Sequence, residues 1–130
     1  MKENEVSNAM YDLRTNAAIG TFIGFLSPDE FKTIANQLLD ILEKKKVKKQ
    51  LNDIKRMKVL KPEVQEWLNT VWFPKAQKVG LKYFAFVVPD DIFGKMSMDG
   101  ANRNAKDTFG IEIQYFNTID NAKNWLISKN

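Results

Sequence analysis

Few side chains of this chain could catalyse a reaction, and the most suggestive of them lie close together near the middle of the sequence. Asp53 carries a carboxylate of the kind used in general acid or base catalysis, and the cations of Lys55 and Arg56 follow it. The chain contains no histidine and no cysteine, which excludes a Ser-His relay, a cysteine nucleophile and the commonest metal ligands. We therefore interpret Asp53 as a carboxylate that caps a backbone amide in a turn, or pairs with Lys55 or Arg56.

The remaining acidic and hydroxyl side chains have spacings that fit no familiar catalytic or metal site. Four aspartates lie in the second half of the chain: Asp90, Asp91, Asp99 and Asp107. They carry the oxygen ligands that hard cations prefer, but their spacing does not match a calcium-binding loop. Ser97 has no histidine to activate it, and a lysine such as Lys95 is a weak substitute. We expect no catalytic residue, no metal and no cofactor.

Two groups of large apolar side chains are candidates for a binding surface. Trp72 and Phe73 directly precede Pro74, and three consecutive bulky residues cannot all point into a core. Core packing is the first interpretation, and an exposed ring that marks a partner or ligand surface is the alternative. Phe93, Met96 and Met98 form a second group, in which unbranched methionine suits irregular contacts. Together the two groups could line an apolar pocket.

Length and composition indicate one globular domain. The chain has 130 residues, 44% hydrophobic residues and a net charge of +4, values typical of a domain with its own core. We expect a flexible leader at residues 1–8 and one domain at 9–130. No apolar run approaches the ~18 residues of a membrane span, and the polar start is unlike a signal peptide, so a cytoplasmic location is expected. The small positive charge and the absence of a known motif predict no nucleic-acid partner.

Hydrophobic periodicity predicts strands alternating with helices. Strands are expected at Met10–Arg14, Ala18–Leu26, Val47–Ile54, Leu81–Val88 and around Ile111–Tyr115. Helices are expected from Pro28 to Lys44–Lys46, from Pro62 to about Val79, and after Asn117 or Thr118. Residues 92–107 carry mixed signals, and whether they form a helix stays open.

Three local features refine this pattern. The third strand is expected to end at Asn52–Asp53, followed by a basic loop that contains Lys55 and Arg56. Pro74 removes a backbone donor from the second helix, which predicts a kink or break near Thr70–Phe73. Gly20 lies on a strand face where its missing side chain would allow a close approach by a helix or another backbone. The predicted fold class is α/β, with a mixed, largely parallel sheet of four or five strands and helices mainly on one face.

The chain resembles the STAS-like family, the anti-sigma-factor-antagonist type of domain, and within it the small stand-alone bacterial proteins. The segments that carry this resemblance span nearly the whole chain: GFLSPDEF, LNDI, EWLNTVWFPKA, GLKYFAFVVP and IDNAKNWL. The resemblance implies a mixed sheet with helices largely on one face, and a binding switch rather than an enzyme. In such switches a Ser or Thr just after the third strand, near an Asp, is phosphorylated to release a partner.

The segment from Asn52 to Arg56 matches the position of that switch but departs from its pattern. Asp53 fits the acidic position, while Ile54, Lys55 and Arg56 stand where the hydroxyl is expected. A phosphoryl group acts by adding nearly two negative charges, so the switch cannot operate here without an acceptor. We predict a non-enzymatic regulatory domain that acts by binding a protein partner, and a homodimer is one form that this binding could take. The alternative, suggested by related lipid-binding folds, is a carrier of a small apolar ligand.

Overall fold

The computed structural model describes residues 6–58, 60–99 and 109–129, with only the helical backbone described at 95–99. Five strands and several helices alternate along the chain. The strands are β1 (Asn8–Asp12), β2 (Ala17–Gly24), β3 (Lys49–Met57), β4 (Tyr83–Val87) and β5 (Glu112–Phe116). The helices are α1 (Pro28–Lys45), α2 (Pro62–Trp67), the π-helix η1 (Leu68–Trp72), α3 (Phe73–Val79), α4 (Asp90–Asp99) and α6 (Ile119–Ile127).

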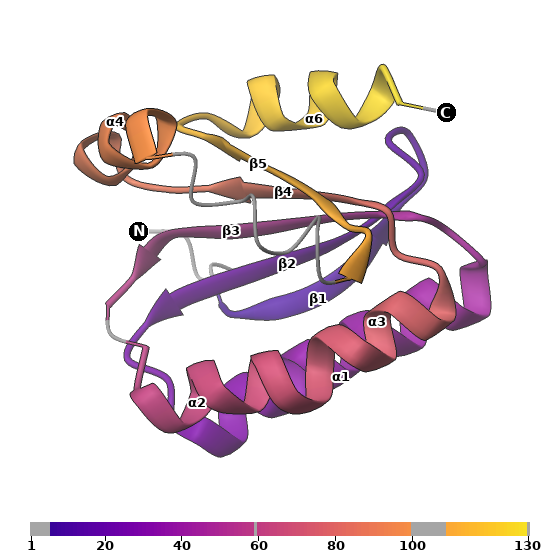
Figure 1. The fold of residues 1–130 in the computed structure, drawn as a ribbon, viewed down its shortest axis with the longest axis horizontal. Coiled ribbons are helices and arrows are strands. Elements are labelled where there is room, and N and C mark those ends of the chain that lie inside the picture. Colours follow the sequence, from indigo (N-terminus) through magenta and orange to yellow (C-terminus); the bar gives the residue numbers. More distant parts are fainter. Residues whose placement is uncertain (1–5, 59, 100–108, 130) are drawn as a thin grey trace.

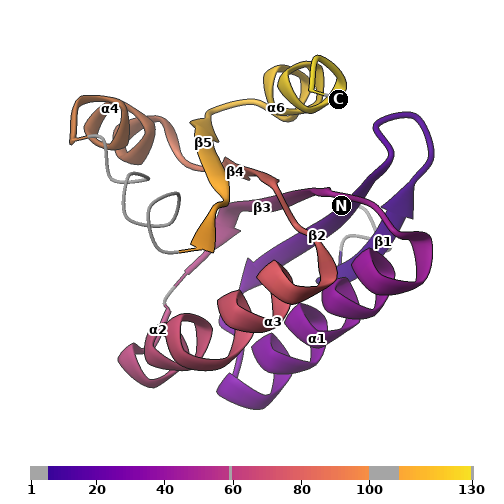
Figure 2. The same cartoon turned by 45° about the vertical axis from the view of Figure 1, so that its right-hand side comes forward.

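The strands form one mixed sheet in the order β1-β2-β3-β4-β5. β1 is antiparallel to β2, and the pairs β2–β3, β3–β4 and β4–β5 are parallel. Helices α1, α2 and α3 cover one face of the sheet, and α6 lies on the other (Figure 1). The second view shows the same two layers, with α1 and α3 side by side (Figure 2). The predicted largely parallel α/β sheet is confirmed, with five strands.

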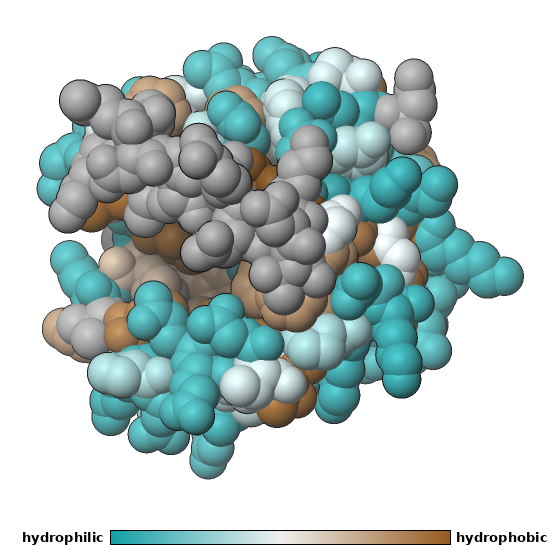
Figure 3. Space-filling view, in the orientation of Figure 1, coloured by the Kyte–Doolittle hydropathy of each residue, from teal (hydrophilic) through white to brown (hydrophobic). Residues whose placement is uncertain are grey.

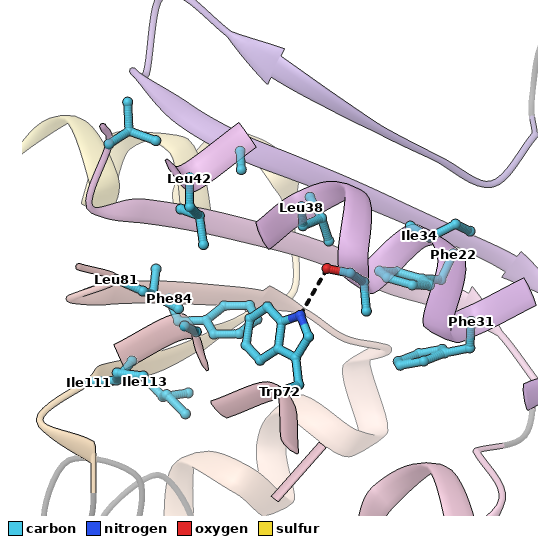
Figure 4. Packing of buried hydrophobic residues seen from close by; sticks show 14 of the residues in the cluster. Phe22, Phe31, Ile34, Leu38, Leu42, Trp72, Leu81, Phe84, Ile111 and Ile113 are labelled. Carbon is cyan, nitrogen blue, oxygen red and sulfur yellow. Dashed lines mark hydrogen bonds between the residues drawn. The ribbon is translucent and has the colours of Figure 1, made fainter. Parts of the chain in front are cut away.

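Each face of the sheet has its own hydrophobic core. The larger one packs β2, β3 and β4 against α1 and the α2–η1–α3 segment, and Phe22, Leu38 and Phe84 are among its fully or nearly fully buried side chains (Figure 4). The smaller one packs Leu51 and Val87 against Leu126 of α6. β4 contributes to both cores, as the two apolar faces of Leu81–Val88 predict.

The turn between β1 and β2 is held by a carboxylate. Asp12 accepts hydrogen bonds from the backbone N–H of Thr15, at 3.1 Å, and from the Thr15 hydroxyl, which is buried. Asn16 follows with φ of 55°, a left-handed conformation that asparagine tolerates. The hydroxyl bond, more than any other interaction, holds the pKa of the Asp12 carboxyl below its usual range.

The Asp12 carboxylate should make the hairpin sensitive to acid. The pKa of the Asp12 carboxyl is lower in the folded protein than in the unfolded chain, where it is ~3.9. The carboxylate therefore stabilises the fold fully above the unfolded pKa, and this contribution is lost as the pH falls through the folded pKa. Asp12→Ala should lower the free energy of unfolding by about 1 kcal/mol at pH 7, a difference that shrinks in acid. Urea unfolding between pH 7 and 3 measures this. Asp40→Ala, on the exposed side of α1, is the control and should be neutral, and a pH-independent loss in Asp12→Ala would contradict the prediction.

Helix α1 begins and ends as its sequence predicts. Ser27 accepts a hydrogen bond from the Glu30 N–H at 3.1 Å, and the Glu30 carboxylate accepts one from the Ser27 N–H at 2.8 Å. This reciprocal pair satisfies two backbone donors that a helix start leaves free. At the other end Lys46 takes a left-handed conformation and closes the helix.

Gly20 lets α1 and β3 approach β2 closely. A Cβ at this position would lie 2.8 Å from Leu38 Cδ1 and 2.9 Å from Asn52 Oδ1. Leu38 is fully buried and cannot move aside freely. The close approach predicted for Gly20 is therefore confirmed.

Replacing Gly20 by alanine should destabilise the protein by about 1–3 kcal/mol, the usual cost of overpacking a filled core. The free energy of unfolding, from urea titration, measures the effect. Gly94→Ala in α4 is the matched control, because nothing lies within 4 Å of its added methyl group. Helix propensity makes that control neutral or stabilising by up to ~1 kcal/mol. Equal stability of the two variants would refute the tight contact at Gly20.

The helix that follows β3 contains one turn of π-helix where a kink was predicted. Pro74 has no N–H to donate, and the preceding Phe73 N–H bonds the carbonyl of Leu68, five residues back. The chain thus absorbs the missing donor by widening one turn. The helix begins at Pro62 and ends at Gly80, whose φ is 103°, as the sequence predicts.

Candidate functional site

A partly enclosed aromatic cavity lies between the sheet, α1, η1 and the start of α3. Its volume is about 70 Å³. The residues that line it, which we call the cavity residues, are Phe31, Ala35, Leu38, Gln50, Asn52, Ile54, Met57, Leu60, Leu68, Trp72, Phe73, Phe84 and Phe86. The space-filling view shows a hollow with hydrophobic surface at its floor, on the left of the molecule (Figure 3). Except for two amides, every described cavity residue is apolar.

The π-helical turn brings Leu68, Trp72 and Phe73 to the cavity wall. Trp72 is 1% exposed, and its indole N–H donates to the carbonyl of Ala35 in α1 at 2.8 Å (Figure 4). This bond ties the α2–η1–α3 segment to α1 and fixes the ring. π-helical turns of this kind occur often at functional sites. One wall of the cavity is thus built by the π-helical turn and the first residue of α3.

A row of aromatic rings continues from the wall across the sheet. Phe84 and Phe86 of β4 stack with ring centroids 4.3 Å apart, and Phe86 stacks on Tyr115 of β5 at 5.6 Å. Phe73 stacks on Phe109 at 5.4 Å. Burial raises the pKa of the Tyr115 phenol above its usual range, so this ring is neutral at physiological pH. The rings supply flat apolar surface without charge.

Two amide side chains of β3 form the polar part of the cavity. The Gln50 amide nitrogen donates to the Asn52 side-chain oxygen at 3.1 Å. In the sheet register Gln50 lies between Ala18 and Phe84, and Asn52 lies between Gly20 and Phe86. The small residues of β2 make room for the amides, and the phenylalanines of β4 flank them.

Asp53 lies inside β3 rather than at its end, so the predicted basic loop is wrong. β3 continues to Met57 and includes Lys55 and Arg56. The register with β2 shifts by one residue after Asp53, which is a β-bulge, and the Asp53 carboxylate accepts the Lys55 N–H there at 3.1 Å. Asp53, which suggested a turn in the sequence, therefore lies at a bulge. There the backbone N–H of Lys55 is not used by the strand ladder, and the Asp53 carboxylate accepts it. The predicted capping role of Asp53 is confirmed.

Asp53 and the aromatic cavity lie on opposite faces of the sheet. Asp53 is paired in register with Val87, which packs in the core under α6. Lys55 is exposed, and its ammonium donates to the backbone carbonyl of Asn117 at 2.8 Å. The amide of Asn117 in turn donates to Asp90 at 3.3 Å. In the described residues no acidic cluster could hold a metal ion.

The later end of β3 supplies no hydroxyl for the switch of the STAS-like family either. No Ser or Thr occurs between Thr33 and Thr70, a span that includes all of β3 and the chain up to η1. Although β3 ends at Met57 and not at Asp53, the residues that follow it still provide no hydroxyl that could accept a phosphoryl group.

Of the two predicted apolar groups, the structure places Trp72 and Phe73 at the cavity and Phe93 away from it. Trp72 and Phe73 are cavity residues, and Trp72 is also core, as the first interpretation held. Phe93 lies in α4 with its side chain half-buried and does not line the cavity. The backbone of Met96 and Met98 is helical, which settles the start of residues 92–107 as α4, but their side chains lie outside the described residues.

Sequence reasoning missed Gln50 and Asn52. The signal that could have revealed them is two amide side chains at alternate positions of one strand. Their neighbours are small residues in β2 and phenylalanines in β4. The adjacent lysines at positions 48 and 49 suggested a solvent-exposed strand, so the two amides were not recognised as buried. Gln50 is in fact fully buried.

No protein-family model and no curated protein sequence matches this chain. Among solved structures, the chain is similar to an uncharacterised protein of the DUF3478 family from Shewanella loihica, described as having a SpoIIAA-like fold. The two share 18% sequence identity over 97% of this chain and 98% of the other, with a TM-score of 0.64. The chain has a SpoIIAA-like fold. This SpoIIAA-like architecture is the one that the STAS-like resemblance predicts.

Within the described residues, no helix combines the length and apolar character needed to cross a membrane.

Proposed function

We propose that this SpoIIAA-like protein is a non-enzymatic binding domain that holds a small, largely apolar ligand in the aromatic cavity. The observation that carries the proposal is the cavity lining, which is apolar except for Gln50 and Asn52. Ligand pockets have this composition, with many apolar side chains and a few placed polar groups. The described cavity residues include no nucleophile, general base or charged group, so the site favours binding over reaction.

The size of the cavity limits the ligand. A cavity of ~150 Å³ in another protein admits benzene. The present cavity of about 70 Å³ is smaller, so a ring would fill it and extend into the opening. Met57, Leu60 and Phe86 are cavity residues that are only partly buried, and they can adjust around that end of the ligand. Methionine is well suited to such adjustment.

The three tryptophans give a direct test of ligand binding. Trp72 lines the cavity, Trp125 packs in the core on the other face of the sheet, and Trp67 lies partly exposed in α2. Adding toluene to 15N-labelled protein should shift the indole N–H signal of Trp72 and leave that of Trp125 in place. Native mass spectrometry of protein purified from cells should show an added small mass. An unshifted Trp72 signal together with a clean apo mass would refute the proposal.

The edge of the sheet supports a second candidate function, binding of a protein partner or a second copy of this chain. β1 is an edge strand that pairs only with β2 among the described strands. Met10 is 50% exposed on it, and Leu13 in the following turn is 80% exposed. Exposed edge strands with apolar side chains pair readily with another chain. A regulatory domain could present this edge to its partner.

Light scattering tests this second candidate in its homodimer form. A dimer through β1 should dissociate when Met10 is replaced by lysine, since a charge on an edge strand opposes pairing. Lys48→Met, away from β1, is the control. A monomer at millimolar concentration would exclude the homodimer and leave a different protein as the partner.

A further inference from the structure

One polar atom of the aromatic cavity has no partner. Gln50 is 0% exposed, and its side-chain oxygen is buried without a hydrogen bond. Buried acceptors are nearly always paired, and an unpaired one costs free energy that a bound donor would recover. The unpaired oxygen belongs to a residue that lines the cavity.

We propose that the ligand is an uncharged, ring-sized apolar molecule that carries one N–H or O–H donor, and that this donor bonds the Gln50 side-chain oxygen. The inference rests on the proposed function and specifies its ligand class. Phenols and aromatic N–H heterocycles are examples of this chemistry. The oxygen selects a donor, and the aromatic walls select a flat apolar body.

The amide is held in place before any ligand binds. The Gln50 nitrogen is bonded to the Asn52 oxygen at 3.1 Å, which leaves the Gln50 oxygen as the free acceptor of the pair. The Asn52 oxygen in turn lies against Gly20, where a Cβ would come within 2.9 Å. An acceptor fixed in this way does not have to be ordered when the ligand binds, which favours affinity.

The lining also disfavours charged ligands. No described cavity residue carries a charge, and the nearby Tyr115 phenol stays protonated. A carboxylate or an ammonium group would lose its hydration in the cavity without gaining a counter-ion, which is costly. Fatty acids and amines therefore fit this site less well than neutral ring compounds do.

A comparison of phenol with toluene in two proteins tests the proposal. The two probes have similar shapes, but only phenol carries a donor. Their affinities would be measured by NMR titration for the wild type and for Gln50→Leu, which replaces the amide with an apolar side chain of similar size. The preference for phenol over toluene should be about ten-fold greater in the wild type than in Gln50→Leu. Comparing the ratios cancels the different hydration of the probes.

Each result decides a different claim. If both proteins bind both probes but the preference is the same in each, the role of Gln50 is refuted and the proposed function stands. If neither probe binds the wild type, the proposed function fails and this inference fails with it. Should Gln50→Leu not fold, Gln50→Met serves in its place. Benzoate binding as tight as phenol binding would refute the requirement for a neutral ligand.

Discussion

Replacing Trp72 by alanine is expected to lower the free energy of unfolding by about 3–5 kcal/mol, the usual cost of deleting a buried aromatic side chain. The ring is 1% exposed and contacts Phe73 and Phe84, with ring centroids 5.2 and 5.7 Å away. Its indole N–H also bonds the Ala35 carbonyl, so the variant loses an interhelical hydrogen bond as well as packing. A loss of this size could approach the whole stability of a small domain.

Urea unfolding of Trp72→Ala, Trp72→Phe and Trp67→Ala separates these contributions. Trp72→Phe keeps an aromatic ring but removes the hydrogen bond, and it should cost less than Trp72→Ala. Trp67 is partly exposed, with the Lys32 ammonium 5.6 Å from its ring, and its replacement should cost about 1 kcal/mol. A loss below 1 kcal/mol in Trp72→Ala would contradict the central position of this ring.

The fold was predictable from the sequence because its signals are local and agree with one another. The capping box at Ser27, the proline at 62 and the glycine at 80 each fix an element boundary by their own backbone chemistry. An irregularity before Pro74 was also predictable, since a missing N–H must be accommodated somewhere nearby. Its form, one turn of π-helix, could not be seen in the pattern.

The end of β3 was mispredicted because a β-bulge and a turn share the same local chemistry. In both, an aspartate accepts a backbone N–H two residues on, as Asp53 does from Lys55. Whether the chain then reverses or continues depends on the neighbouring strand. Here β2 continues alongside, and the Lys58 N–H bonds the Gly24 carbonyl at 3.0 Å, so the strand goes on.

The candidate site was only half predictable, because a cavity is a property of several elements at once. Trp72 and Phe73 stood out in the sequence as a bulky pair beside a proline. Gln50 and Asn52 did not, since their importance comes from the strands beside them. Only the register places Gln50 next to Phe84 and Asn52 next to Gly20.

Filling the cavity should abolish ligand binding while preserving the fold. Ala35 is a cavity residue, 3% exposed, on the face of α1 that meets Trp72. Leucine at this position would occupy space that the ligand needs, so the affinity for toluene should fall at least ~30-fold, equivalent to ~2 kcal/mol of lost apolar contact. The added side chain strains the core but also gains packing contacts. Because the two effects oppose each other, the free energy of unfolding should change by about 1–3 kcal/mol in either direction.

Gln37→Leu is the matched control, because it adds the same side chain to the exposed side of α1, two residues further on. It should bind toluene as the wild type does. Normal binding by Ala35→Leu would place the ligand elsewhere and refute the cavity as the site, and Leu68→Phe provides a second filled variant if Ala35→Leu unfolds. Ala35→Leu removes the space and Gln50→Leu removes the acceptor. We expect Ala35→Leu to bind neither phenol nor toluene, and Gln50→Leu to bind both but without the preference for phenol. That result would show that the apolar walls supply the affinity and the amide supplies the selectivity.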